Sequence, residues 1–122
     1  MSYAIEWSGH LVNVDPDDRV AILPDNGSEV ALMFMPGVAC PVMIAISGQH
    51  PVWSWNGDKQ EPTFSPSILT RLPWAGNAVV NHVFIWNGKI QYLSDCSHEY
   101  AGKTIDLPKL SEWPEEYILW DK

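Results

Sequence analysis

Residues 79–94 decide the fold: two strand-like runs, VVNHVFIW (79–86) and KIQYLS (89–94), are joined by Asn87-Gly88. Both runs are rich in the β-branched and aromatic residues that favour strands. The two central residues of a type I′ turn need a positive φ, so Asn-Gly between such runs is the strongest short signal of a β-hairpin. The sequence therefore predicts an antiparallel hairpin here.

A two-residue loop also fixes the register of this hairpin. The predicted pairs are Trp86 with Lys89, Ile85 with Ile90, Val83 with Tyr92, His82 with Leu93, and Asn81 with Ser94. Side chains alternate between the two faces of a strand. One face then holds Val79, Asn81, Val83, Ile85, Ile90, Tyr92 and, if the strand continues, Cys96 and His98. The other face holds His82, Phe84, Trp86, Lys89 and Gln91.

Length and composition indicate a single globular domain over residues 1–122, with an acidic, aromatic C-terminal tail over 109–122. The hydrophobic share of 46% and the charged share of 18% are those of a folded protein. Ten prolines and eight glycines interrupt the chain too often for long helices. We therefore expect an all-β, mostly antiparallel fold, a compact sandwich or partly open barrel with little helix.

Further strands are predicted at residues 2–7, 19–23, 28–35, 41–46, 53–55 and 103–107. Ser8-Gly9-His10 is predicted to break the first strand, and the turn residues 24–27 to join the second and third as a hairpin. The apolar run 41–46 is typical of a strand buried on both faces. Residues 61–70, with Pro62 and Pro66, are predicted to be an edge strand or a pinned loop, followed by a loop at 72–77. Residues 111–120 are expected to form one or two helical turns.

The charge balance restricts the partners. Seven basic and 15 acidic residues give a net charge of −8, which disfavours direct nucleic-acid binding and favours a basic host or phage protein as partner. Neither a signal peptide nor an apolar run long enough to span a membrane is present. The two cysteines, Cys40 and Cys96, could pair, but nothing in the sequence marks a secreted disulfide framework. We expect no membrane association and a location in the cytoplasm of a bacterial host cell.

Five motifs in order resemble one small protein family. They are WSWNGD (53–58), PTFSPSI (62–68), HVF (82–84), IQYLSDCSH (90–98) and AGKTIDLP (101–108). The resemblance is to proteins of tailed-phage genomes and prophages that often carry the label "ammonia monooxygenase", and it spans about residues 53–108. We see no copper, haem or di-iron ligand set that would support that label.

The resemblance also implies a structural zinc site, because the family has Cys-x-x-Cys, Cys-His and Cys-x-His motifs at corresponding places. Here Cys96 and His98 match the last motif and Cys40 is the candidate for the first, whereas Gly37 and Asn81 stand where cysteines would be. Structural zinc takes four thiolate or imidazole ligands. A site of Cys40, His82, Cys96 and His98 would need a bulge that turns His82 over. The alternative, which we favour, is no cofactor and a degenerate site held by packing and hydrogen bonds.

Other candidate residues each have a structural alternative. Cys96 and His98 could form a thiolate–imidazolium pair, although most buried cysteines are small hydrophobic residues. Asp58, Glu61 and Asp95 could be acid/base carboxylates, but each adjoins turn residues. Ser65 and Ser67 lie among prolines, without the Gly-x-Ser-x-Gly elbow of a nucleophile. Trp53 and Trp55 could stack a ligand or belong to the core.

Two functions remain open from the sequence. The first is a non-enzymatic, phage-encoded accessory or counter-defence protein that binds a host protein through an acidic, tryptophan-rich surface. The acidic residues available for steering include Asp15, Asp17, Asp18, Glu112, Glu115 and Glu116. The second is a small-molecule binding protein or enzyme with a pocket near Trp53, Trp55, Cys96 and His98. The candidate binding residues are Trp53, Trp55, Asp58 and Asp95.

Overall fold

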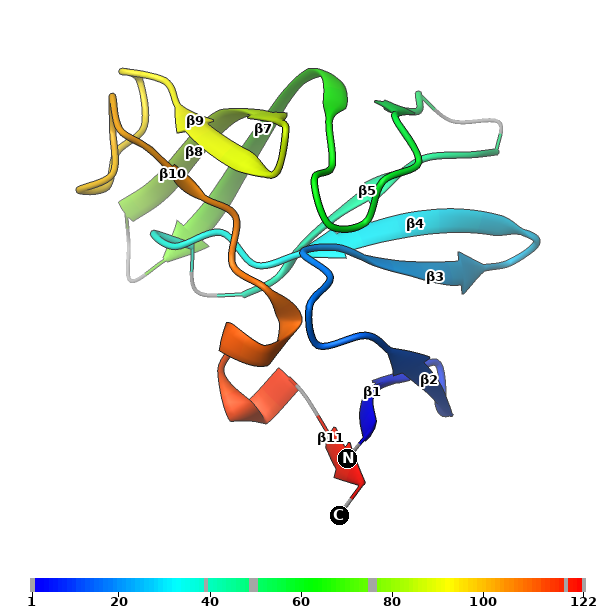
Figure 1. Cartoon of the computed structure of the whole chain (residues 1–122). Coiled ribbons are helices and arrows are strands. Elements are labelled where there is room, and N and C mark those ends of the chain that lie inside the picture. The colour runs from blue at the N-terminus through cyan, green and yellow to red at the C-terminus, as the bar shows by residue number, and fades with distance from the viewer. Residues whose placement is uncertain (1, 39, 49–50, 75–76, 118, 122) are drawn as a thin grey trace.

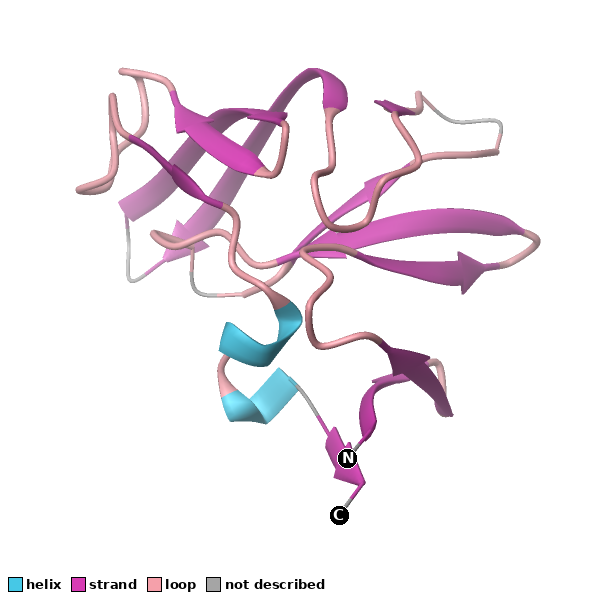
Figure 2. Cartoon of the chain, viewed as in Figure 1, coloured by secondary structure: helices cyan, strands magenta, loops and turns pink. Residues whose placement is uncertain are grey.

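The structure, a computed structural model, describes residues 2–38, 40–48, 51–74, 77–117 and 119–121. Its strands are β1 Ser2–Trp7, β2 His10–Val14, β3 Ala21–Asp25, β4 Ser28–Met33, β5 Val42–Ala45, β6 Ser54–Trp55, β7 Phe64–Trp74, β8 Asn77–Trp86, β9 Lys89–Tyr92, β10 Thr104–Asp106 and β11 Leu119–Asp121. The helical elements in these ranges are the 3₁₀ turns η1 Leu110–Glu112 and η2 Glu115–Tyr117. The predicted all-β, antiparallel class is confirmed (Figure 2).

The strands form three antiparallel sheets (Figure 1). The largest has the order β10-β9-β8-β7-β6, and the others have the orders β3-β4-β5 and β11-β1-β2. Strand β1 pairs with β11, so the two ends of the described chain lie side by side. The strands described do not close into a barrel.

The central hairpin has the predicted register. Val83 pairs with Tyr92, Ile85 with Ile90 and Trp86 with Lys89. Asn87 and Gly88 have φ of 48° and 74°, as a type I′ turn requires. The backbone N–H of Leu93 donates to the carbonyl of His82 at 2.9 Å, as expected for the predicted pair of these two residues. The strand does not continue further, because residues 93–96 form a turn in which the Cys96 N–H donates to the Leu93 carbonyl, so the predicted pair of Asn81 with Ser94 is wrong.

Two apolar clusters hold the sheets together. The larger joins the inner faces of the five-stranded sheet and of β4 and β5 as a sandwich, with Val20, Ala31, Met33, Met35, Val38, Val42, Ile44, Phe64, Ile68, Val83, Ile85, Ile90, Tyr92, Cys96 and Leu107. The smaller lies between β3-β4, β1 and the 3₁₀ region, with Ile5, Ala21, Leu23, Val30, Leu110 and Trp113. Burial of this apolar area is the main favourable contribution to folding. The hairpin face that holds Val83, Ile85, Ile90 and Tyr92 is therefore the core face.

Three predictions about individual elements are wrong or incomplete. Ser8 and Gly9, with φ of 51° and 80°, are a hairpin turn that leads into β2, not a break. In β5 the side chain of Met43 is 52% exposed between buried neighbours, so that strand is not buried on both faces. The tail has the expected short helical turns, but residues 119–121 form an unpredicted strand.

Strand β7 differs most from the prediction. It lies between β6 and β8 rather than at an edge, and it continues to Trp74 through part of the predicted loop. Phe64 pairs with Ile85 and Ile68 with Val83, so residues 65–67 lie opposite the single residue Phe84. This bulge tolerates Pro66, which has no N–H for a regular ladder. A proline-containing segment can therefore occupy a central position.

Among the described residues, no helix is long and apolar enough to cross a membrane.

Candidate active site

A serine, a histidine and an aspartate are connected in series on the outer face of the large sheet. Ser67 Oγ lies 3.1 Å from His82 Nε2. On the other side of the ring, His82 Nδ1 lies 3.0 Å from Asp95 Oδ2 and 3.3 Å from Oδ1. The three side chains come from the β7 bulge, from β8 and from the loop after β9.

The chemistry of the groups determines the direction of each hydrogen bond. An ionised carboxylate only accepts, so the proton of the neutral imidazole belongs on Nδ1. His82 Nε2 then carries the lone pair and accepts the hydrogen bond of the Ser67 hydroxyl. This tautomer is the one in which a histidine can remove a proton from the serine.

The bulge in β7 places Ser67 beside His82. Leu69 is the direct cross-strand partner of His82, and Ser67 lies two residues before Leu69, on the same face. The indole Nε1 of Trp53 donates to the carbonyl oxygen of Ser67 at 3.2 Å. Trp53, predicted as a ligand-stacking residue or a core residue, thus holds the backbone of the serine.

Cys96 fixes the segment that carries Asp95. Its Sγ accepts from the backbone N–H of His82 at 3.3 Å and donates to the carbonyl of the same residue at 3.3 Å. Next to it, the backbone N–H of Ser97 donates to the carbonyl of Val80 at 3.0 Å. Because Cys96 follows Asp95 directly, these bonds hold the carboxylate at the imidazole. The thiol of Cys96 is thus bonded to the backbone of His82 and not paired with His98.

His98 lies on the inner side of the sheet, behind the site. Its Nδ1 accepts from the backbone N–H of Tyr100 at 3.2 Å, so Nε2 carries the proton and donates to Asn81 Oδ1 at 2.8 Å. Asn81 is fully buried, and its amide also donates to Met35 Sδ. Gly37 packs directly on the ring, where a Cβ would lie 2.6 Å from His98 Nδ1. Desolvation lowers the pKa of His98, and the nearby Glu99 partly opposes that shift.

The lowered pKa of His98 predicts acid-sensitive stability. The unfolded chain, in which His98 titrates near 6.5, binds more protons than the folded chain in this range. The stabilising contribution is present above that value and is lost as the pH falls through the lowered folded pKa. We expect the free energy of unfolding to fall less steeply in His98→Gln than in the natural chain between about pH 7.5 and about pH 5. Urea titrations at a series of pH values measure the free energy of unfolding. The control is His10→Gln, at an exposed position, in which this free energy should change with pH as steeply as in the natural chain. If the free energy of His98→Gln changes with pH as steeply as that of the natural chain, the prediction is contradicted.

The four candidate zinc ligands do not share a site. The thiol of Cys96 bonds the backbone of His82, His98 bonds Asn81, and the imidazole of His82 faces Asp95 on the opposite side of the sheet. Cys40 is exposed. Among the described residues, no three His, Cys, Asp or Glu side chains are grouped so that they could hold a metal ion. No bulge turns His82 over, as this zinc site would require.

The candidate binding residues have separate positions. Asp58 accepts from the backbone N–H groups of Glu61 and Gln60, which lower its pKa in that order, so it stabilises a turn. Trp55 stacks on Phe64, with ring centroids 6.3 Å apart, and packs on the core. Asp95 belongs to the serine–histidine–aspartate series. Asp95 therefore belongs to the site, and Trp53 contacts it through the backbone of Ser67. Asp58 and Trp55 lie outside the site.

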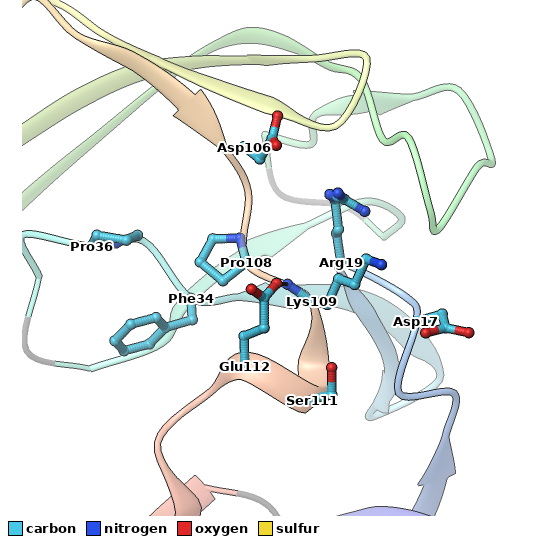
Figure 3. A pocket seen from close by; sticks show the side chains of 9 residues that line it. All are labelled: Asp17, Arg19, Phe34, Pro36, Asp106, Pro108, Lys109, Ser111 and Glu112. Atoms are coloured by element: carbon cyan, nitrogen blue, oxygen red, sulfur yellow. Dashed lines mark hydrogen bonds between the residues drawn. The ribbon is translucent and has the colours of Figure 1, made fainter.

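A separate cavity of about 720 Å³ lies away from these residues (Figure 3). It is lined by Asp17, Arg19, Phe34, Pro36, Asp106, Pro108, Lys109, Ser111 and Glu112. Its charges have both signs, and none of its lining residues belongs to the series at Ser67. Its volume therefore does not make it the reactive site.

A serine, a histidine and a carboxylate bonded in this order are the active-site arrangement of serine hydrolases. The chain matches the model of the family BubE, described as "Bacterial ubiquitination-like system serine protease", over residues 8–93, and it belongs to this family. The match includes Ser67 and His82 and ends two residues before Asp95. Comparison with curated proteins and with solved structures gives no match.

The family corrects the functional predictions made from the sequence. The assignment to a phage family labelled "ammonia monooxygenase" is wrong, because the family match is to a protease of a bacterial system. The prediction of a non-enzymatic phage accessory or counter-defence protein is wrong for the same reason. The alternative, which included an enzyme, agrees better with this family.

Sequence reasoning missed Ser67 because it required a Gly-x-Ser-x-Gly elbow. That elbow belongs to one fold, whereas the same three groups occur on unrelated folds. A usable signal was present in the hairpin. The register pairs Leu93 with His82, and this brings Asp95, two residues further along the chain, close to the histidine. The turn at residues 93–96, which the register does not predict, sets the face on which Asp95 lies.

Proposed function

We propose that this chain is a serine protease that uses Ser67 as nucleophile, His82 as general base and acid, and Asp95 to orient the imidazole. The observation that carries the proposal is the continuous series of hydrogen bonds from Ser67 Oγ through both nitrogens of His82 to Asp95. Membership in a family of serine proteases supports it. In keeping with the family description, the expected substrate is a protein of a bacterial ubiquitination-like system.

In this reaction Ser67 Oγ attacks the carbonyl carbon of the cleaved bond while His82 Nε2 takes the hydroxyl proton. The tetrahedral intermediate expels the amine, which receives that proton from the imidazolium. A water molecule, deprotonated by the same nitrogen, then hydrolyses the acyl-serine and regenerates the free enzyme. Asp95 keeps the proton of Nδ1 in place and stabilises the positive charge that forms on the ring.

The exposure of the site favours a polypeptide substrate. The side chains of His82 and Asp95 are 25% and 59% exposed. The series lies on the outer face of a sheet, and the large cavity has none of its residues. A small molecule is normally held in a concave pocket, whereas a segment of a protein chain can lie across an open face.

A fluorophosphonate probe tests the proposal. The activated serine oxygen should displace fluoride from phosphorus, and mass spectrometry should locate the adduct on Ser67. Ser67→Ala should abolish labelling. Ser65→Ala is the matched control, because Ser65 lies in the same bulge but is not bonded to His82, and it should be labelled normally. Labelling of another residue, or none, would contradict the assignment.

A further inference from the structure

We propose that three exposed apolar side chains, Leu69, Phe84 and Trp86, form the surface that receives the substrate beside the cleaved bond. The occupant is an extended segment of the substrate protein that has large apolar side chains. We call this surface the apolar strip. The inference rests on the proposed function, because it assigns the specificity of the site at Ser67.

The register of the sheet puts the apolar strip next to the nucleophile. Leu69 is the cross-strand partner of His82. Phe84 follows His82 on the same face of β8, and it is the residue that lies opposite the 65–67 bulge. Trp86 is the next residue on this face. The strip therefore flanks the serine and the histidine on both strands.

Exposed large hydrophobic side chains gather on the apolar strip. Leu69, Phe84 and Trp86 are 47%, 41% and 42% exposed, and they are three of the six exposed large hydrophobic side chains among the described residues. Isolated exposed hydrophobic residues are ordinary, but neighbouring ones on one face mark a binding surface. The apolar strip is continuous with the triad. A substrate segment whose cleaved peptide bond lies at Ser67 would therefore also cover the strip.

The charges beside the strip support an apolar occupant. On the same face, Lys89 is the cross-strand partner of Trp86, and its Nζ lies 2.8 Å from Asp106 Oδ1. The opposite charges of these two groups cancel, so together they give this side of the strip no net charge that would select an acidic or a basic substrate side chain. The site therefore gains more from apolar contact than from charge complementarity on this side.

Peptidyl diphenyl phosphonates test the inference, since the serine displaces phenoxide from phosphorus and the rate reports recognition of the attached peptide. We would compare a Leu-Leu-Phe reagent with a Ser-Ser-Gly reagent, and express each rate relative to that of the fluorophosphonate. The natural chain should react about tenfold or more faster with the apolar reagent. Phe84→Ser and Trp86→Ser should each remove most of this preference. Leu11→Ser, at a 66% exposed residue of β2, should keep it.

The outcomes separate the two proposals. An apolar preference that persists in Phe84→Ser and Trp86→Ser, or a natural chain that prefers the Ser-Ser-Gly reagent, would overturn the inference while leaving Ser67 as nucleophile. A natural chain that reacts with neither phosphonate nor with the fluorophosphonate would overturn both proposals. Thermal unfolding of each variant shows whether a lost preference comes from a lost fold. If one serine variant does not fold, Phe84→Thr or Trp86→Thr, with a side chain that favours strands, takes its place and should lose the preference in the same way.

Discussion

Ser67→Ala and His82→Ala are each expected to slow hydrolysis of p-nitrophenyl acetate by at least about a thousandfold, and the double variant is expected to be no slower than either single variant. The nucleophile needs the base at 3.1 Å to lose its proton, and without the nucleophile no acyl-serine forms for a base-activated water molecule to hydrolyse. Removing either group therefore removes the whole function of the pair. Initial rates of nitrophenolate release measure the three effects.

Ser65→Ala is the matched control for this experiment, and its rate should equal that of the natural chain. The acetyl group is small and makes little contact with the apolar strip, so the assay measures the triad rather than substrate recognition. Losses that add in the double variant would show that Ser67 and His82 act independently, and they would contradict the proposed mechanism. Unchanged thermal unfolding of Ser67→Ala would show that the loss is not structural.

The hairpin and the core face could be predicted from the sequence because both depend on local signals. Asn87-Gly88 sets the turn, and the turn sets the pairing of Val83 with Tyr92. The strand at β7 could not be predicted as central. Its prolines lack the N–H groups that a regular hydrogen-bonded ladder needs, so the sequence favours an edge position. In the structure β7 pairs with both β6 and β8, and a bulge in β7 accommodates Pro66.

The difference between local signals and the pairing of distant strands also explains which residues of the site could be predicted from the sequence. His82 and Asp95 belong to one hairpin and to the turn that follows it, so their proximity follows from the register, whereas the turn at residues 93–96 sets the face of Asp95. Ser67 reaches His82 only through the pairing of a separate strand, at the place where the register shifts. That contact depends on tertiary structure, and no local pattern encodes it.

The zinc interpretation and the proposed triad draw on the same segment of the chain. The motif IQYLSDCSH contains Asp95, a candidate binding residue, and Cys96 and His98, two candidate metal ligands. In the structure Asp95 bonds the outward imidazole, while Cys96 and His98 bond the backbone of His82 and the side chain of Asn81. The turn at residues 93–96 separates these roles, because Asp95 lies on the outer face of the sheet whereas Cys96 belongs to the core.

Asp95→Asn is expected to slow the same hydrolysis by about a hundredfold or more. The asparagine amide can donate to Nδ1, and this stabilises the tautomer that has its proton on Nε2. That tautomer cannot take the proton of Ser67, and the imidazolium also loses the charge that stabilises it. The side chain of Asp95 is 59% exposed, so water can partly replace the carboxylate, and we expect a smaller loss than for Ser67→Ala or His82→Ala.

Glu99→Gln is the control for Asp95→Asn, because it removes an exposed negative charge from the same loop without touching His82. Its rate should remain close to that of the natural chain. A similar loss in both variants would mean that the negative charge of the loop, rather than the bond at 3.0 Å, supports the reaction. If only Asp95→Asn is slow while its thermal unfolding is nearly unchanged, the carboxylate orients the imidazole, since a half-exposed ion pair contributes little to stability.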